Sequence, residues 1–156
     1  MKIVIQRVSW SKVIVDKKIV SQIKQGILLL VGIEEKDNQE NLLNEIVSKI
    51  LKLRIFSDQN DKMNLSIEEI KGEILVVSQF TLLADTTQGN RPYYGNAAGP
   101  EIAKPIFNKL VEELKKSKLK VETGIFGAKM EVELLNDGPV TILPVCLLKY
   151  PTLDIL

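Results

Sequence analysis

Two segments of the chain carry continuous runs of apolar residues: residues 27–33, and residues 74–77 within the segment 73–80. Runs of this kind are typical of strands that are covered on both faces. They predict two central strands of a sheet. Residues 2–8, 12–16 and 18–23 are rich in β-branched residues and indicate three further strands, with a turn at Asp16 and Lys17.

Two other segments carry apolar residues at helical spacing. The first stripe runs from Leu42 to Leu51, and Asp37 with Glu40 three residues later has the pattern of a capping box that begins a helix. The second helix is expected over residues 102–116. Pro105 predicts either that this helix begins near Lys104 or that it kinks at the proline.

The remaining segments complete a mixed architecture. Strands are expected over residues 118–122, 128–135 and 140–145, with a turn at 136–139. Residues 56–72 read as a loop with a short strand at 63–67, and residues 84–98 as a long loop of the kind that is often functional. We therefore predict a single domain over residues 1–156, of the α/β class with α+β character. Its mixed β-sheets form a layered or barrel-like arrangement with two main helices on one side.

Composition removes several classes of function. The net charge is +1, which excludes a strongly basic nucleic-acid module but not a local basic patch. The chain has no histidine, so no Ser-His-Asp or Cys-His arrangement and no imidazole zinc site can form. Cys146 is the single cysteine, which excludes an intramolecular disulfide and suits a reducing compartment; we expect it to be buried packing. No apolar run is long enough to cross a bilayer, so we expect a cytoplasmic protein without a membrane partner.

Three polar side chains stand at the end of the second buried strand: Ser78, Gln79 and Thr81. Ligand sites of open α/β sheets collect at such strand ends. These side chains also suit a purely structural role, in which they satisfy backbone groups. Thr81 is a poor candidate for a nucleophile because a neutral hydroxyl needs a neighbouring base. A binding or positioning role is therefore expected for it.

The sequence Asn136-Asp137-Gly138-Pro139 fits two interpretations equally well. Asp-Gly favours a hairpin turn between two strands. A hairpin does not explain the proline that follows Gly138, and X-Pro bonds are the ones that adopt cis at low cost. A cis bond here would turn backbone carbonyl groups outward as acceptors.

Other charged and aromatic residues are candidates for contacts with RNA. Arg91 lies in the long loop with two tyrosines, which suits phosphate contact and base stacking or else a mobile surface loop. A lysine cluster between residues 115 and 120 reads better as a solvated face. Arg7 shares an apolar strand face with Ile3 and Ile5, so its charge needs a partner.

The segment at residues 124–130 combines small and apolar residues. Gly127 and Ala128 would let a flat ligand approach the backbone closely. Phe126 is placed to stack on such a ligand, although Phe126 and Met130 also suit the core.

Taken together, these motifs resemble D-aminoacyl-tRNA deacylases of the bacterial and eukaryotic type. The resemblance spans almost the whole chain. It rests on residues 6–8, 26–32, 78–82, 89–92, 124–130 and 136–141, and above all on the order of Ser-Gln-Phe-Thr and Asn-x-Gly-Pro-Val-Thr. Two features depart from many relatives: Tyr93-Tyr94 replaces Ser-Phe, and residues 147–156 are longer and more apolar, which suggests an addition to a dimer contact.

The resemblance implies an activity and an assembly. The enzyme would hydrolyse the ester between a D-amino acid and the terminal adenosine of tRNA, and would also remove mischarged glycine. It would need no cofactor or metal. It would be a homodimer with its active sites at the subunit interface, where Gly138-Pro139 is cis and projects into the partner's site.

The resemblance also implies roles for individual residues. The carbonyl groups of Gly138 and Pro139 would bind the substrate ammonium group and exclude L side chains, with Arg7 and Asn136 as supporting residues. The catalytic segment would be Ser78, Gln79, Phe80 and Thr81, whose backbone N–H groups near Phe80 and Thr81 would stabilise an oxyanion. The residues that contact adenosine or tRNA would be Phe126, Gly127, Ala128, Met130 and Arg91.

Two alternatives remain beside this interpretation. One is a non-catalytic RNA-binding domain on the same fold. The other is an esterase that uses Thr81 as its nucleophile.

Overall fold

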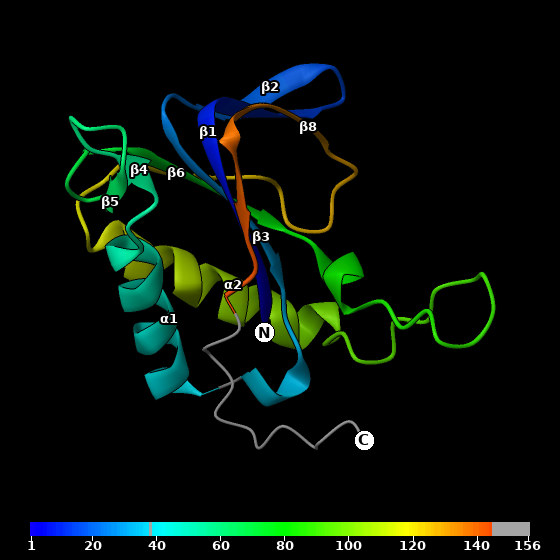
Figure 1. Cartoon of the computed structure of the whole chain (residues 1–156). Coiled ribbons are helices and arrows are strands. Elements are labelled where there is room, and N and C mark those ends of the chain that lie inside the picture. The colour runs from blue at the N-terminus through cyan, green and yellow to red at the C-terminus, as the bar shows by residue number, and fades with distance from the viewer. Residues whose placement is uncertain (38, 145–156) are drawn as a thin grey trace.

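A six-stranded mixed sheet forms the centre of the molecule (Figure 1). Five strands follow the order β2-β1-β3-β6-β7, and β8 pairs with the other edge of β1. Strands β3, β6 and β7 are parallel, whereas β1 is antiparallel to each of its neighbours. The strand bounds are β1 Lys2–Val15, β2 Lys18–Ile23, β3 Gly26–Gly32, β6 Glu73–Ser78, β7 Val121–Thr123 and β8 Glu131–Ile142. A separate pair, β4 (Phe56–Ser57) and β5 (Met63–Leu65), stands outside this sheet.

This computed structural model describes residues 1–37 and 39–144. The predictions for Cys146 and for residues 147–156, together with the end of the strand expected at 140–145, lie outside the described residues.

Both central strands are covered on both faces, as their continuous apolar runs predict. Ile27 and Leu29 of β3 face the helices, in one cluster with residues of α1 (Glu40–Lys52) and α2 (Pro100–Lys115). Leu28 of β3 and Leu75 of β6 belong to a second cluster on the opposite face. The sheet thus packs one hydrophobic core against its helices and encloses a second core on the opposite face.

The predicted architecture is confirmed. The sheet is mixed and curls into a nearly closed, barrel-like form, and both helices lie on one side of it (Figure 1). Neither helix in the described part of the chain is long and apolar enough to cross a membrane.

Both helix starts differ from the prediction. Asp37 does not cap α1, because it lies buried in the short 3₁₀ helix η1 (Glu35–Asp37), and the N-cap of α1 is Gln39 without a side-chain hydrogen bond. Helix α2 begins at Pro100, which occupies the favourable first turn, and Pro105 lies within the helix.

The strands at the two chain ends are longer than predicted. Residues 2–15 form one strand rather than two, with shifts of register against β8 near Val8. Of the two interpretations of residues 136–139, the hairpin turn is wrong: β8 runs through these residues, and Asn136 and Thr141 pair with Val8 and Gln6 of β1. The strand expected at 118–122 begins only at Val121, and that expected at 128–135 only at Glu131.

Candidate active site

A cavity of about 510 Å³ opens at the ends of β3 and β6. Apolar side chains dominate its wall. Its lining comes from four segments, which are the end of β3, residues 77–80, the loop before α2 with the start of that helix, and residues 126–132. The end of β6, which the sequence predicted as a ligand site, therefore borders a cavity.

Most of the candidate residues line this one cavity. Ser78, Gln79 and Phe80 come from the end of β6 and the residues after it. Four more candidates come from a segment far away in the sequence: Phe126, Gly127, Ala128 and Met130. The fold thus brings together two motifs whose proximity no local pattern could reveal.

Thr81 lies next to the cavity lining rather than in it. It is exposed, and its Oγ1 accepts a hydrogen bond from the Gln79 side-chain amide. Phe80 and Thr81 begin the 3₁₀ helix η2 (Phe80–Leu83). N–H groups in the first turn of a helix have no acceptor within it, so these two backbone donors are available at the mouth of the cavity.

The turn that carries these donors is fixed from both sides. The Gln79 N–H donates to Val31 O of β3 at 2.7 Å, and the Ala84 N–H donates to Thr81 O at 3.1 Å. Phe80 remains 56% exposed, and its ring meets Tyr94 edge-on with 5.1 Å between the centroids. An exposed aromatic ring beside a cavity is available for contact with another molecule.

The long loop before α2, residues 84–99, extends from the body of the molecule, and we call it the arm (Figure 1). Its base is closed by two backbone hydrogen bonds between Asp85 and Tyr93, of 2.8 and 2.9 Å. The Asp85 carboxylate accepts the backbone N–H and the hydroxyl of Thr87, and these bonds hold its pKa below the ordinary value. Arg91 is exposed near the end of the arm and does not line the cavity.

Phe126 satisfies both interpretations of its segment. Its ring packs on Phe107 of α2 with 5.7 Å between centroids, and the same residue lines the cavity. Beside it, Gly127 has a positive φ of 78°, and a Cβ built there would meet nothing within 4 Å. The backbone at Gly127 is therefore open to a ligand.

The Gly138–Pro139 peptide is cis and exposed, and neither residue lines the cavity of its own chain. Gly138 has φ of 119°, a conformation that residues with a Cβ rarely adopt. A Cβ built on Gly138 would lie 2.8 Å from Arg7 Nη2 and 2.9 Å from Val140 Cγ2. Only glycine fits here without movement of its neighbours.

Arg7 is the buried partner of this bend. It is 8% exposed, and its Nε lies 3.1 Å from both the carbonyl oxygen and the Oδ2 of Asp137. Its Nη1 donates to Ile55 O at 2.5 Å. The charge on the apolar strand face thus links the bend in β8 to the chain that follows α1.

Asn136 and the lysine cluster are two further candidates from the sequence. Asn136 Oδ1 is buried without a hydrogen-bond partner among the described residues. In the lysine cluster at the end of α2, Lys115, Lys116 and Lys120 form ion pairs with glutamates, which agrees with a solvated face. The described residues contain no cluster of acidic or cysteine side chains suited to a metal ion.

Sequence reasoning missed part of the cavity wall. Val31 and Ile33 from the end of β3, and Ala97 and Ala98 from the arm, also line it. Ala98 N–H donates to Ile33 O at 2.9 Å, so the arm and the strand form the wall together. In the sequence, only the unusual length of the loop before α2 indicated that this segment could contribute to a site.

Comparison with known proteins gives a consistent result. Residues 4–144 match the family model described as D-Tyr-tRNA(Tyr) deacylase. The chain is 58% identical to a D-aminoacyl-tRNA deacylase of Flavobacterium psychrophilum over 144 residues, which cover 92% of this chain and 95% of the relative. It is 51% identical to a D-aminoacyl-tRNA deacylase of Thermosipho africanus, over 92% of this chain and 95% of the relative.

Solved structures share the fold. One, described as c-Myc DNA Unwinding Element Binding Protein, is 40% identical with a TM-score of 0.85, over 92% of this chain and 97% of that one. Another, described as a probable eukaryotic D-amino acid tRNA deacylase, has a TM-score of 0.78 over 91% and 97% of the two chains. At 15% identity, the second similarity shows the fold alone.

Proposed function

The chain belongs to the D-Tyr-tRNA(Tyr) deacylase family, and from this premise we propose that it hydrolyses the ester bond of D-aminoacyl-tRNA. The products are the free D-amino acid and the tRNA. The observation that carries the proposal is the meeting of residues 78–80 and 126–130 around one cavity. These are the segments that the family resemblance assigns to catalysis and to adenosine binding.

The cavity suits the terminal adenosine of tRNA. Small-molecule sites are mostly apolar hollows with a few polar groups, and this one combines an apolar wall with Ser78 and Gln79 at its edge. Phe126 offers a ring on which the base can stack, and Ala128 and Met130 complete the wall. Arg91, exposed on the arm, would contact a phosphate of the tRNA.

Catalysis in this proposal uses the main chain and the substrate. The N–H groups of Phe80 and Thr81 stabilise the oxyanion that forms when water attacks the ester carbonyl. The chain has no histidine to serve as a base. The 2′-hydroxyl of the terminal ribose moves protons instead, which gives a preference for RNA over DNA.

Discrimination between enantiomers is assigned to a second copy of the chain. Gly138 and Pro139 are exposed and lie outside the lining of their own cavity, so they are free to enter a partner's. Their carbonyl groups would bind the substrate ammonium group, and an L side chain would then run into the backbone, which is discrimination by exclusion. Buried Arg7, which binds Asp137, would hold this bend in place, with Asn136, whose Oδ1 is buried, as the second supporting residue.

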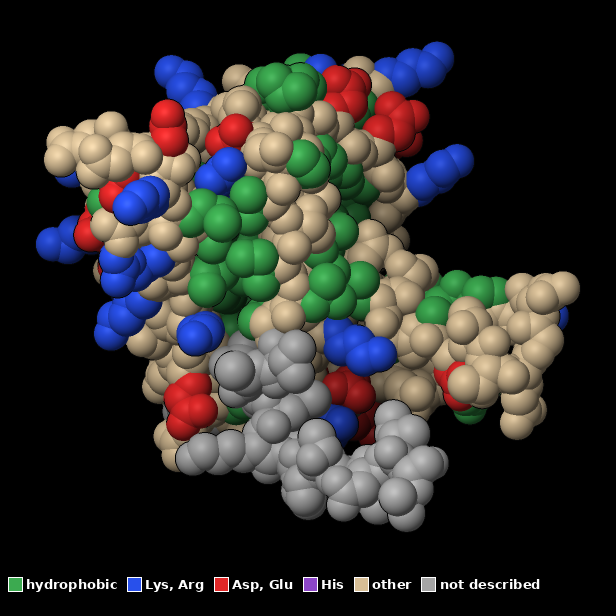
Figure 2. Space-filling model, in the orientation of Figure 1, with side chains coloured by type: hydrophobic (Ala, Val, Ile, Leu, Met, Phe, Trp, Pro, Cys, Tyr) green, Lys and Arg blue, Asp and Glu red, His purple; other side chains and the backbone are tan. Residues whose placement is uncertain are grey.

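Exposed apolar residues along the β1–β8 edge support the proposed homodimer. Trp10 of β1, Leu135 of β8 and Leu143 after it are large and exposed. Figure 2 shows hydrophobic side chains gathered on both sides of the course of β8. Exposed apolar side chains gathered in this way are typical of a protein interface.

Two finer statements follow from the same proposal. Glycine has no side chain to exclude, so glycyl-tRNA is a second substrate. The protein acts in the cytoplasm, because aminoacyl-tRNA is used there.

The decisive test compares matched D- and L-tyrosyl-tRNA. We expect the purified protein to release D-tyrosine far faster than the spontaneous rate and to leave the L ester at its background rate. Acid-precipitable radiolabel measures both reactions. Equal cleavage of the two esters would remove the chiral part of the proposal.

The second candidate is a non-catalytic nucleic-acid-binding domain. The observation that favours it is the structural neighbour described as a DNA-element-binding protein, at 40% identity. A protein of this kind would bind D-tyrosyl-tRNA and leave it intact, so a binding assay beside the deacylation assay separates the two.

Replacement of Thr81 by alanine tests for a nucleophile. Thr81 is exposed, lies outside the cavity lining and has the Gln79 amide as its side-chain partner, not a base. We expect Thr81→Ala to lower kcat by about tenfold, because one lost hydrogen-bonded contact costs up to about 1.5 kcal/mol. A fall to the spontaneous rate, together with an acyl-enzyme trapped in the original protein, would identify Thr81 as the nucleophile.

A further inference from the structure

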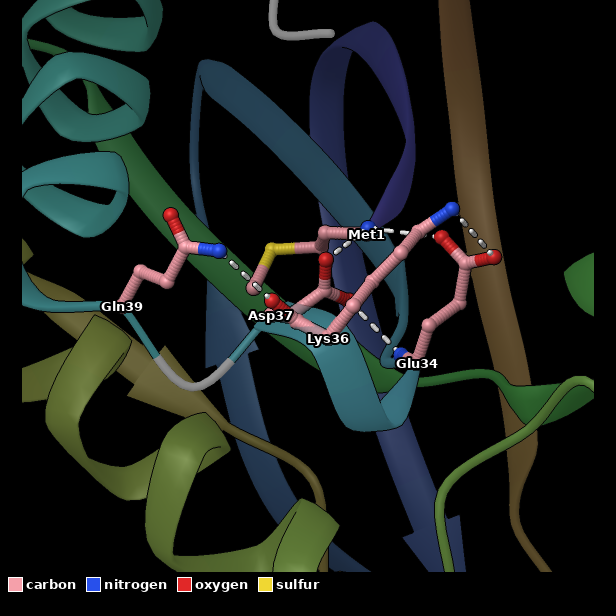
Figure 3. A network of polar contacts seen from close by, with 5 residues as sticks. All are labelled: Met1, Glu34, Lys36, Asp37 and Gln39. Carbon is pink, nitrogen blue, oxygen red and sulfur yellow. Dashed lines mark hydrogen bonds and ion pairs between the residues drawn. The ribbon is translucent and has the colours of Figure 1, made fainter. Parts of the chain in front are cut away.

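The amino terminus of the chain is buried. Met1 is 7% exposed, and its side chain belongs to the main hydrophobic cluster. Its α-ammonium group donates to Glu34 Oε2 at 3.0 Å and to Asp37 Oδ1 (Figure 3). A buried charge is costly unless it is paired, so these two carboxylates are what makes burial of the terminus possible.

Both carboxylates are held in place by further contacts. Asp37 is 1% exposed, and its second oxygen accepts the backbone N–H of Glu34 at 2.6 Å. The other oxygen of Glu34 pairs with Lys36 Nζ at 3.3 Å (Figure 3). Burial raises the pKa of Glu34, but the hydrogen bond and charge of the Met1 ammonium, with Lys36, outweigh this and lower it.

We propose that Glu34 and Asp37 form a recognition site for a free α-ammonium group on Met1, so that the stable fold requires Met1 to be present and unacylated. An acyl group converts the amine into a neutral amide and removes the charge. Two carboxylates, one of them fully buried, would then face a group with no positive charge.

The requirement links the fold to processing of the nascent chain. Where synthesis starts with formylmethionine, as it does in bacteria, the terminal nitrogen of the nascent chain is an amide. A deformylating hydrolase adds one water molecule across the formyl C–N bond, releases formate and leaves the amine, which takes up a proton. The proposed site is complete only after that step.

The position of the ammonium group matters as much as its charge. One residue added or removed moves the terminal nitrogen by up to about 3.8 Å, beyond hydrogen-bond reach of both carboxylates. Loss of Met1 would also remove a side chain from the core. The site therefore selects against methionine removal as well as against acylation.

The site adjoins the wall of the cavity. Glu34 directly follows Ile33, which lines the cavity and accepts the N–H of Ala98 from the arm. Disturbance at the amino terminus would therefore reach the cavity wall. The inference itself concerns stability and does not depend on the proposed reaction.

The test compares three forms of the untagged protein by urea unfolding: free Met1, N-acetylated Met1, and a chain extended by one serine at its start. We expect both altered forms to lose about a hundredfold or more in the folding equilibrium constant, as when one partner of a buried ion pair is removed. In the Asp37→Asn background, acetylation should cost much less, because coupled groups are not additive. Lys36→Gln, which removes the exposed ion-pair partner of Glu34 and keeps the Met1 ammonium group, is the matched control and should shift the midpoint far less than either altered form.

A second measurement holds even if the altered forms fail to fold. Intact mass of the purified native protein should show Met1 present, without formyl or acetyl. Equal unfolding midpoints for the three forms would overturn the proposal, and so would a stable native protein whose terminus is acylated. Neither outcome bears on deacylation.

Discussion

Replacement of Gly138 by alanine should lower kcat/KM for D-aminoacyl-tRNA about a hundredfold, the usual effect of a misplacement of about 1 Å near the reacting groups. A methyl group at this position has no room. It would lie 2.8 Å from Arg7 Nη2 and 2.9 Å from Val140 Cγ2, on a backbone with φ of 119°. Arg7 is held by Asp137 and Ile55, so the bend must move instead of the arginine.

Gly89 provides a matched control for this substitution. It also has a positive φ, 72°, but a Cβ built there would meet nothing within 4 Å. Gly89→Ala therefore carries the cost of the backbone conformation, about 1 kcal/mol, without the collision. Single-turnover deacylation should be unchanged in Gly89→Ala and slow in Gly138→Ala. Full activity in both would show that the bend at Gly138 takes no part in the reaction.

The central strands were predictable because their burial on both faces is visible in the residues of each strand alone. The run at residues 27–33 has no polar face, and the structure buries Ile27, Leu28 and Leu29 on alternating sides. The stripe of the first helix was equally readable. Hydrophobic patterns with a period of 2 or 3.6 residues indicate directly which side chains are buried. Predictions based on them therefore do not depend on how distant parts of the chain pair.

The hairpin turn in β8 and the helix cap at Asp37 were wrong predictions, because contacts with residues distant in the sequence outweighed the local preference. Asp137-Gly138 favours a hairpin in isolation, but β8 continues through it because Asn136 and Thr141 pair with β1. The partner residues are 128 to 135 positions earlier in the chain, and nothing local to the turn reports them. Asp37 likewise matches a capping box, but the terminal ammonium group and the Glu34 N–H compete for its carboxylate.

For the candidate site, the sequence identified the members and the structure supplied their arrangement. Ser78 and Gln79 stood out as polar residues at a strand end, and Phe126 as an aromatic ring among small residues. Their common cavity depends on β6 and β7 being parallel neighbours, which places the segment after β7 beside the end of β6. Arg7 was detectable as a charge on an apolar face, but its acceptors Ile55 O and Asp137 O were not.

Substitution of Arg7 by methionine should destabilise the protein by about 2–3 kcal/mol, because it leaves backbone acceptors without a donor. The two acceptors are Ile55 O and Asp137 O, both of which face the guanidinium group. The Asp137 side chain is 39% exposed, so water compensates for most of its lost ion pair. Unfolding in urea at neutral pH measures the loss.

The same substitution should also weaken discrimination between enantiomers, since Arg7 binds Asp137 and its Nη2 occupies the space into which a Cβ on Gly138 would point. We expect the ratio of D- to L-tyrosyl-tRNA cleavage to fall about tenfold, the equivalent of 1.4 kcal/mol. Lys12→Met is the control, because Lys12 also links β1 to β8 through an ion pair, with Glu133 at 2.8 Å, but on the solvent side. That pair should contribute below about 0.5 kcal/mol and should leave the ratio unchanged. If Arg7→Met lowered stability but kept the full ratio, Arg7 would support the fold without positioning the bend, and the chiral selection would have to come from another part of the interface.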